Sequence, residues 1–205
     1  MKPRYWKRAT EALAANDAVM HRLIATHKCL TVGSRGNAFQ TLSRAIVGQQ
    51  ISVKAAQSVW ERFAVAHDGV SPEAVGRSTL ERLRACGLSG QKSAYLIDLA
   101  AHFRSGRLDP AQWKRLDDEV LIALLTEVKG IGRWTAEMFL IFNLTRPDVF
   151  PVGDLGLQKA MQLHYNRGRK LTPQRMQRIG AAWAPWRSVA TWYLWRSLDP
   201  IPVEY

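Results

Sequence analysis

Asp154 is the residue whose surroundings first suggest chemistry. It stands between Gly153 and Leu155, and the stretch from Leu155 to Leu198 contains eight Lys and Arg but no acidic residue. A carboxylate in such a place can stabilise a positive charge that develops on a bound molecule. It can equally accept a backbone N–H bond as the N-cap of a following helix. The spacing alone favours neither role.

A pair of glycines precedes this carboxylate in KGIGRWTA, residues 129–136, between a predicted helix that ends at about Val128 and one that begins near Arg133. Glycines around a hydrophobic residue permit a tight turn, positive φ and close approach to another surface. We expect Ile131 to fill the space between the helices. The N–H groups that open the second helix would bind a phosphate, with Lys129 beside them. This pattern predicts a helix–hairpin–helix, which contacts the DNA backbone without reading its sequence. A plain turn with a C-cap glycine is the alternative.

A second glycine turn, GLSGQK at residues 87–92, precedes a predicted helix that holds Tyr95 and Leu96. Ser89, Gly90 and Lys92 in this turn are candidates for another phosphate contact. A simple turn explains the segment equally well.

The charge balance indicates the kind of partner. The chain of 205 residues has 29 Lys and Arg against 17 Asp and Glu, a net charge of +12. This charge favours nucleic acid or an anionic membrane surface, and we prefer nucleic acid; a solvated basic face without a specific partner is the alternative. No apolar run approaches the roughly 20 residues that span a bilayer, and the N-terminus lacks an apolar signal core. We expect a cytoplasmic protein, associated with the nucleoid if bacterial, that does not bind membranes.

The cysteines and histidines give no metal-binding pattern. Cys29 and Cys86 lack the CxxC spacing, and the five histidines are scattered, although His27 lies near Cys29. Two candidate ligands do not make a zinc site, and so few cysteines are consistent with a reducing compartment.

Helical signals run through almost the whole sequence. Helix starts are marked by Ser71 before a proline, by Ser78 with Glu81 in a capping box, and by Thr172 before another proline. An amphipathic helix is predicted from Asp117 onward, with apolar residues Val120, Leu121, Leu124, Leu125 and Val128. No alternating strand pattern of convincing length occurs. The sequence therefore predicts an all-α protein of about ten helices, which could form two lobes.

These motifs resemble the helix–hairpin–helix DNA glycosylase superfamily, and within it the alkylpurine (3-methyladenine, type II) DNA glycosylases. The resemblance rests on KGIGRWTA at 129–136, DVFPVGDLGLQKA at 148–160, AIVGQQISVKAA at 45–56, GLSGQKSAYL at 87–96 and APWRSVATWYLWR at 184–196. It covers most of the chain from about residue 36 to 197. It implies a single glycosylase domain over residues 1–205, two-lobed and helical. The middle lobe is expected at about 36–130, and the second lobe from the N-terminal helix with about 131–205. The N-terminal mixed β domain of some relatives is not expected, because the first 35 residues are too few for it.

The resemblance assigns the catalytic carboxylate to Asp154. It implies base-excision repair by a monofunctional glycosylase that hydrolyses the N-glycosidic bond of alkylated purines such as 3-methyladenine and 7-methylguanine. A carboxylate about 4 Å from the sugar contributes on the order of 4 kcal/mol at an effective dielectric constant near 20, or roughly three powers of ten in rate. These purines already carry a positive charge and depart neutral, so no strong general acid is needed. Asp148, the rival carboxylate, is expected to shape the turn after Pro147.

Relatives that also cut the DNA strand carry a lysine in the hairpin, and its position falls on Trp134 here. Indole cannot form a Schiff base, so we expect water as the nucleophile and no lyase activity. Two cysteines cannot hold the four-cysteine iron–sulfur cluster of some relatives. No cofactor is expected to be required. The carbonyls of Thr126, Val128 and Ile131 are candidates for a structural monovalent or divalent cation, as in relatives.

An enzyme of this kind flips the target base out of the duplex. By family position, Trp134 and Trp195 are candidates to stack on the cationic base, with Met138 and Leu155 beside them. For Met138 and Leu155, ordinary core packing is the preferred alternative. Gln49 and Gln50 match the wedge that fills the gap in the duplex. The expected DNA-contacting residues are Lys129, Gly130, Ile131, Gly132, Thr135, Ser89, Gly90 and Lys92.

The expected partner is double-stranded DNA that contains alkylated bases, bound by a monomer. Two other functions stay open. One is a glycosylase for deaminated or mismatched bases, and the other is a helix–hairpin–helix DNA-binding module without enzymatic activity.

Overall fold

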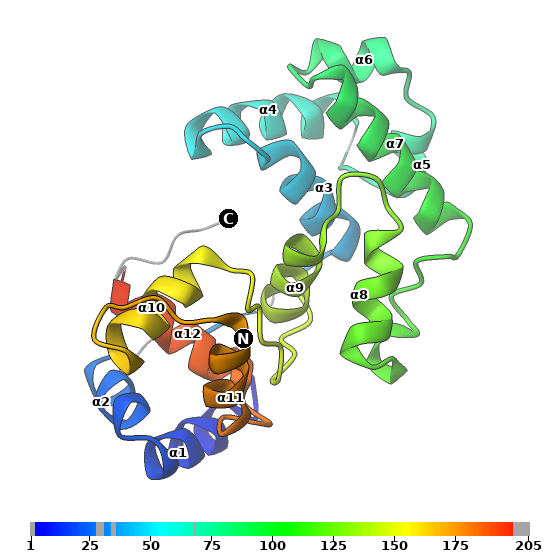
Figure 1. Ribbon diagram of the computed structural model, residues 1–205. Coiled ribbons are helices and arrows are strands. Elements are labelled where there is room, and N and C mark those ends of the chain that lie inside the picture. Colours follow the sequence, from blue (N-terminus) through cyan, green and yellow to red (C-terminus); the bar gives the residue numbers. More distant parts are fainter. Residues whose placement is uncertain (1–2, 28–30, 34–35, 68, 199–205) are drawn as a thin grey trace. The chain divides into compact units, whose positions relative to one another are not determined.

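The computed structural model describes residues 3–27, 31–33, 36–67 and 69–198 (Figure 1). Within these ranges the chain forms twelve α-helices, one short 3-10 helix and no strand, which confirms the predicted all-α fold. The helices are α1 (Trp6–Asn16), α2 (Ala18–Thr26), α3 (Ala38–Gly48), α4 (Val53–Ala66), α5 (Pro72–Gly76), α6 (Leu80–Ala85), α7 (Gly90–Arg104), η1 (Trp113–Arg115), α8 (Asp118–Thr126), α9 (Arg133–Phe142), α10 (Leu155–Tyr165), α11 (Pro173–Ala181) and α12 (Arg187–Leu198). None of these helices combines the length and the apolar character that a bilayer span requires.

The helices gather in two compact units, and each is described by itself. Unit 1 takes its described residues from 3–33 and 140–198, whereas unit 2 takes them from 36–139. The division falls inside α9, after Phe139. The middle lobe expected from the sequence, about 36–130, lies within unit 2.

Unit 1 is built around a core in which helices from both ends of the chain pack together. Its fully buried side chains include Trp6, Met20, Trp183 and Tyr193. Burial of apolar surface on this scale is the main stabilising contribution to such a unit. Helices α1, α2, α10, α11 and α12 all contribute to this core or pack against it.

Asp17 joins the N-terminal helices of unit 1 to the C-terminal ones. One oxygen caps α2 by accepting the N–H groups of Val19 and Met20. The other accepts the Tyr165 hydroxyl at 2.9 Å and the Trp183 indole N–H at 3.0 Å. Burial, followed by the Asp17 charge, raises the pKa of Tyr165. The hydroxyl therefore stays protonated and continues to donate.

The core of unit 2 contains a chain of edge-to-face aromatic contacts. Phe39 meets Phe103, Phe103 meets Trp113, and Trp113 meets Phe139, with ring centroids 5.2, 6.0 and 5.4 Å apart. Aromatic pairs favour this arrangement because the positive edge of one ring faces the negative face of the next. The chain of contacts ties α3 and α7 to η1 and the first turns of α9.

Most helix starts follow their sequence signals, with one correction. Ser71 and Thr172 cap α5 and α11, each before a first-turn proline, as predicted. The predicted capping box at Ser78 was wrong by one residue. Thr79 caps α6, while the Ser78 hydroxyl hydrogen-bonds with the imidazole of His67 at 3.0 Å.

The amphipathic pattern after Asp117 does form a helix, α8, but its buried face differs slightly from the prediction. Leu121, Leu125 and Val128 are buried as expected. Val120 is 47% exposed, and Ile122 takes a place in the core instead. The reason is that Ile122 and Leu125, three residues apart, share a face with Leu121, whereas Val120 lies outside that stripe.

Candidate active site and DNA-contacting turns

Asp154 is half-buried at the N-terminus of α10, in unit 1. Its Oδ1 accepts the N–H of Leu157 at 2.6 Å, so Asp154 does cap this helix. The same oxygen also accepts the indole Nε1–H of Trp195, which lies 41 residues further along the chain, at 2.8 Å. A cap requires only the first bond. The second bond further restricts the direction of the carboxylate.

Trp195 lies on α12 and is itself held in place. Its ring stacks on Phe142 with centroids 5.7 Å apart and an interplanar angle of 18°. A Cβ on Gly156 would lie only 3.2 Å from both the Asp154 Oδ1 and the Trp195 ring. Gly156 is therefore the small residue that lets the indole reach the carboxylate. Sequence reasoning missed it, although a glycine in the first turn of a helix is itself a signal, because glycine weakens helices.

His164 and Ser197 form a second link between α10 and α12. The imidazole Nε2 and the Ser197 hydroxyl are 2.8 Å apart. Burial, and then the charge of Arg22, lower the pKa of His164. The neutral imidazole is thus favoured, and it connects the two helices that carry Asp154 and Trp195.

Asp148 has a structural role, as the sequence led us to expect. Its two oxygens accept the Arg187 Nε at 2.8 Å and Nη2 at 2.7 Å, and Oδ1 also accepts the Arg187 backbone N–H. This two-pronged pairing, typical of arginine with a carboxylate, anchors the start of α12. Both Asp148 oxygens are therefore engaged by Arg187.

The predicted hairpin lies in unit 2, between α8 and α9. Gly130 has φ of +83°, and a Cβ there would lie 2.1 Å from the Tyr95 ring. Only glycine fits this position. The turn is also bonded to its neighbours, because Asp98 accepts the Lys129 backbone N–H at 2.9 Å and the Gln49 amide donates to the Gly130 carbonyl at 2.7 Å. Ile131 is buried, as expected for a side chain that fills the turn.

Gly132 differs from Gly130 in its backbone conformation. Its φ is not positive, and a Cβ added to it would meet nothing within 4 Å. Nothing inside unit 2 requires glycine here, which leaves the exposed surface available for close approach by a ligand. The Ala136 N–H bonds to the Gly132 carbonyl at 3.0 Å and so begins the ladder of α9. The preceding N–H groups lie at the helix N-terminus, where anions bind.

Arg133 strengthens the hairpin from within. Its guanidinium donates to both oxygens of Glu119 on α8, at 2.9 and 2.6 Å, and to Glu137 at 2.9 Å. Hydrogen bonding from Arg133 lowers the pKa of Glu119. Because two carboxylates compensate the Arg133 charge, the exposed cation offered by the turn itself is Lys129.

The wedge candidates have different surroundings. Gln49 is half-buried and uses its amide to hold the Gly130 carbonyl. Gln50 is exposed and adopts φ of +58°, which is uncommon for a residue with a side chain. Lys92, expected to contact phosphate, donates to the carbonyls of Val47 at 2.8 Å and Gln49 at 2.7 Å. At most one of its three N–H groups is left for DNA. Its two bonds hold the loop between α3 and α4, residues 49–52 (the wedge loop), against α7.

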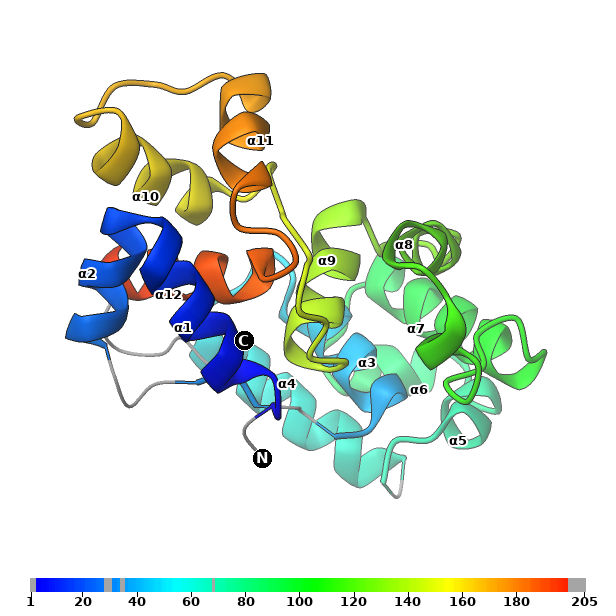
Figure 2. The ribbon, with the colours of Figure 1, turned by 90° about the horizontal axis from the view of Figure 1, so that it is seen from below.

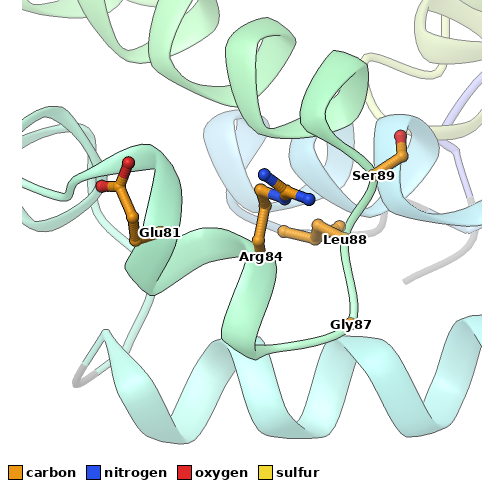
Figure 3. Close-up of a pocket in the computed structure, with 5 residues that line it drawn as sticks. All are labelled: Glu81, Arg84, Gly87, Leu88 and Ser89. Atoms are coloured by element: carbon orange, nitrogen blue, oxygen red, sulfur yellow. The ribbon is translucent and has the colours of Figure 1, made fainter.

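Ser89 and Gly90 form the start of α7. The Ser89 hydroxyl accepts the Lys92 backbone N–H at 3.2 Å, and Gly90 has open space around it. A surface hollow of about 700 Å³ adjoins this turn, and Figure 3 shows its residues projecting from α6 and from the loop before α7. It is lined by Glu81, Arg84, Gly87, Leu88 and Ser89. Without an aromatic side chain among these five, the hollow does not suit stacking of a flipped base.

The base-pocket candidates are divided between the units. Trp134, 45% exposed, and the half-buried Met138 lie one turn apart on the part of α9 that belongs to unit 2. Trp195 and Leu155 belong to unit 1, and Leu155 is 79% exposed. Core packing, the preferred alternative for Leu155, was therefore wrong. Thr135 is half-buried beside Trp134.

The metal predictions stay predictions. The Val128 carbonyl accepts the Ile131 N–H at 3.1 Å. A cation bound by the carbonyls of Thr126, Val128 and Ile131 stays a prediction. Across the described ranges no three His, Cys, Asp or Glu side chains cluster as metal ligands. Cys29 lies outside the described residues. Cys86 is buried, and burial raises the pKa of its thiol.

Comparison with known proteins identifies the family of the chain. The sequence profile of the HhH-GPD superfamily of base excision DNA repair proteins matches residues 43–186. The chain belongs to this superfamily. It is 36% identical over 163 residues to DNA-3-methyladenine glycosylase 1 of Schizosaccharomyces pombe, covering 78% of this chain and 72% of that protein. The predicted resemblance is thus confirmed.

Solved structures of this superfamily agree with the fold. The crystal structure of a DNA-3-methyladenine glycosidase from Bacillus halodurans matches with a TM-score of 0.87 and 35% identity, over 93% of this chain and 89% of that one. The S. pombe 3-methyladenine DNA glycosylase in complex with abasic DNA matches with a TM-score of 0.78 and 31% identity, over 96% of this chain and 100% of that one.

Proposed function

We propose that this member of the HhH-GPD superfamily is a monofunctional DNA glycosylase that releases alkylated purines such as 3-methyladenine and 7-methylguanine. The observation that carries the proposal is the carboxylate of Asp154, held by N–H donors from Leu157 and Trp195. Relatives named as 3-methyladenine glycosylases support the substrate class. The expected compartment is the cytoplasm, and the expected form is a monomer.

The chemistry needs little more than this carboxylate. The bond between C1′ and the purine nitrogen breaks, and its electron pair neutralises the positive charge of the alkylated base. Asp154 stabilises the positive charge that develops on the sugar, as in other oxocarbenium-like reactions. Water then attacks C1′ and releases a proton to solvent, which leaves an abasic site. Because Trp134 replaces the amine that a Schiff base requires, the strand stays intact.

The other parts prepare the DNA. The N-terminus of α9, with Gly132 and Lys129, binds a phosphate, and the start of α7 at Ser89 and Gly90 binds another. Gln50 enters the duplex in place of the flipped base, since the Gln49 amide already holds the hairpin. Trp195, which bonds to Asp154 within unit 1 and stacks on Phe142, offers an aromatic face for the cationic base.

The test compares base release by the wild type and by Asp154→Asn on duplex DNA methylated at purines. Asparagine keeps an oxygen that accepts both observed bonds and removes only the negative charge. We expect release to slow by roughly three powers of ten, while DNA affinity changes little. Glu11→Gln, which removes an exposed carboxylate of the same unit, is the control and should leave release unchanged.

Each outcome decides between functions. Free 3-methyladenine or 7-methylguanine, with strands intact until alkali treatment, supports the proposal. Release of uracil or hypoxanthine but no methylated purine would identify a glycosylase for deaminated bases. Tight DNA binding without release of any base would mean that Asp154 is only a helix cap and that the protein is a DNA-binding module.

A further inference from the structure

The net charge of the chain is concentrated in unit 1. Its described residues include thirteen Lys and Arg against four Asp and Glu, a net charge of +9. The described residues of unit 2, which carry the hairpin, include thirteen against ten, a net charge of only +3. The predicted phosphate-binding turns therefore do not account for the basic character of the protein.

Within unit 1 the excess charge gathers on the loop after α10 and on α11. We call Arg167, Arg169, Lys170, Arg175 and Arg178 the 167–178 basic surface. All five side chains are exposed. Figure 2 shows the loop crossing from the end of α10 (yellow) to the start of α11 (orange).

The loop presents its cations on a fixed backbone. Arg167 and Gly168 have φ of +51° and +78°, and the Gly168 N–H bonds to the Gln162 carbonyl at 2.8 Å at the end of α10. The Asn166 amide donates to the carbonyls of both Arg169 and Lys170, each at 3.0 Å. With its backbone bonded in this way, the loop loses less conformational entropy when its side chains bind a ligand.

Helix α11 extends the same surface. Thr172 caps it by accepting the Arg175 N–H at 3.3 Å. Arg175 and Arg178 lie three residues apart, so they project from the same side of the helix, about 4.5 Å apart along its axis. The opposite side carries Met176, which is buried in the core of unit 1.

The carboxylates of unit 1 are engaged elsewhere. Asp17 bonds to Tyr165 and Trp183, Asp148 to Arg187, and Asp154 to Trp195. Glu11, the remaining acidic residue among the described parts of this unit, pairs with Lys7 at 3.9 Å. Because these carboxylates bond to other residues, the 167–178 basic surface keeps its positive charge and attracts an external polyanion.

We propose that the 167–178 basic surface binds the phosphate backbone of undamaged duplex DNA. Arginine suits phosphate because its planar group donates in pairs. A lipid surface fits poorly, because helices that lie on membranes expose large apolar residues, whereas Met176 and Ile179 of α11 pack inward. The contact carries no sequence information, and it would hold the protein on DNA while it searches for a lesion. This inference does not depend on which base is released.

The test measures the salt dependence of binding to an undamaged 30-base-pair duplex. The triple variant Arg167→Gln, Arg169→Gln, Lys170→Gln removes the three charges of the loop. If each contacts a phosphate, the slope of log K against log salt should become shallower by about 2.7, since each contact contributes about 0.9. The matched control removes three exposed charges of unit 2, through Arg77→Gln, Lys114→Gln and Arg115→Gln, and should leave the slope close to that of the wild type.

Further readouts separate the explanations. Single-turnover base release at saturating enzyme should be unchanged in the loop variant, so a failure of the proposed function is distinguishable from a failure of this inference. Circular dichroism and thermal melting check folding, and Arg175→Gln with Arg178→Gln repeats the test on α11. Equal slopes in the loop variant, the α11 variant and the control would overturn the proposal. The proposal would also be overturned if the loop variant lost binding to phosphatidylglycerol vesicles while its binding to DNA was unchanged.

Discussion

The hydrogen bond between Trp195 and Asp154 predicts a variant that separates positioning from stacking. Trp195→Phe keeps an aromatic ring that can stack on Phe142, but it removes the N–H that donates to the Asp154 Oδ1 at 2.8 Å. The bond from Leu157 remains, so Asp154 still caps α10. The carboxylate then loses one of the two donors that fix its direction.

The expected loss of rate follows from the distance to the reacting sugar. At an effective dielectric constant of about 20, a carboxylate contributes about 4.2 kcal/mol at 4 Å and about 3.3 kcal/mol at 5 Å. A drift of about 1 Å therefore slows base release roughly fourfold by the Coulomb effect alone. Misorientation can raise the loss to about 100-fold. We expect a value between these limits, smaller than the loss in Asp154→Asn.

The assay is single-turnover release of 7-methylguanine at saturating enzyme, for the wild type, both single variants and the double variant. At saturating enzyme, differences in DNA affinity do not affect the measured rate. The lost hydrogen bond should lower the free energy of unfolding by about 1.5–3 kcal/mol, so the assay is run well below the melting temperature, where all variants stay folded. If Trp195 acts through Asp154, its substitution should have little further effect once the carboxylate is gone.

Two results would refute this reasoning. Release by Trp195→Phe at the wild-type rate would mean that the indole N–H plays no part in positioning Asp154. An equal slowing by Trp195→Phe in the presence and absence of the Asp154 carboxylate would mean that Trp195 acts independently, as a stacking surface for the base.

Three further predictions concern the hairpin, the wedge loop and the link between α10 and α12. Gly130→Ala should lower the free energy of unfolding by about 2–4 kcal/mol in urea denaturation, because alanine is strained at positive φ and would overlap a ring. Gly132→Ala should leave that free energy unchanged and weaken duplex binding roughly tenfold, because the added methyl group obstructs the phosphate. The assigned roles would be contradicted if Gly130→Ala were only weakly destabilised or if Gly132→Ala bound the duplex as tightly as the wild type. Lys92→Met should cost about 1–3 kcal/mol of unfolding free energy through two lost carbonyl contacts, whereas the exposed Lys54→Met should cost nothing measurable. Burial lowers the pKa of His164 below its ordinary 6.5, so its contribution to stability is full above about pH 6.5 and falls as the pH drops through the folded-state pKa. Melting temperatures from pH 7.5 to 5 should therefore decline more in the wild type than in His164→Gln, and parallel curves would exclude His164 as the cause.

Much of the fold and the outline of the site could be predicted from the sequence, because both depend on local signals. Caps such as Ser71 and Thr172 act within one helical turn, and the positive φ at Gly130 is likewise a property of its own turn. The helix-capping bond of Asp154 was also open to prediction, since its partner Leu157 lies three residues away. Local hydrogen bonds follow from sequence spacing.

The partners that arrive from distant segments could not be predicted in this way. The bond from Trp195 to Asp154 spans 41 residues, and that from Gln49 to the Gly130 carbonyl spans 81. Lys92 is a further example, because its acceptors, the carbonyls of Val47 and Gln49, lie 45 and 43 residues away along the chain. Val120 was misplaced for a related reason, since the contacts of α8 decide which stripe of an apolar helix is buried.

These distant contacts define two groups of residues, one expected to affect DNA binding and the other the rate of base release. In unit 2, the bonds of Lys92 and Gln49 and the packing of Tyr95 join the wedge loop, α7 and the hairpin, so a change in one of these elements is expected to affect the others. In unit 1, the bond from Trp195 to Asp154 joins α12 to the start of α10. Substitutions in the first group should therefore change mainly the dissociation constant for DNA, and those in the second mainly the rate of base release. The free-energy effects of substitutions at sites without shared partners usually add. In the double variant Gly132→Ala, Trp195→Phe, the ratio of the release rate to the dissociation constant should therefore fall by the product of the two single-variant factors.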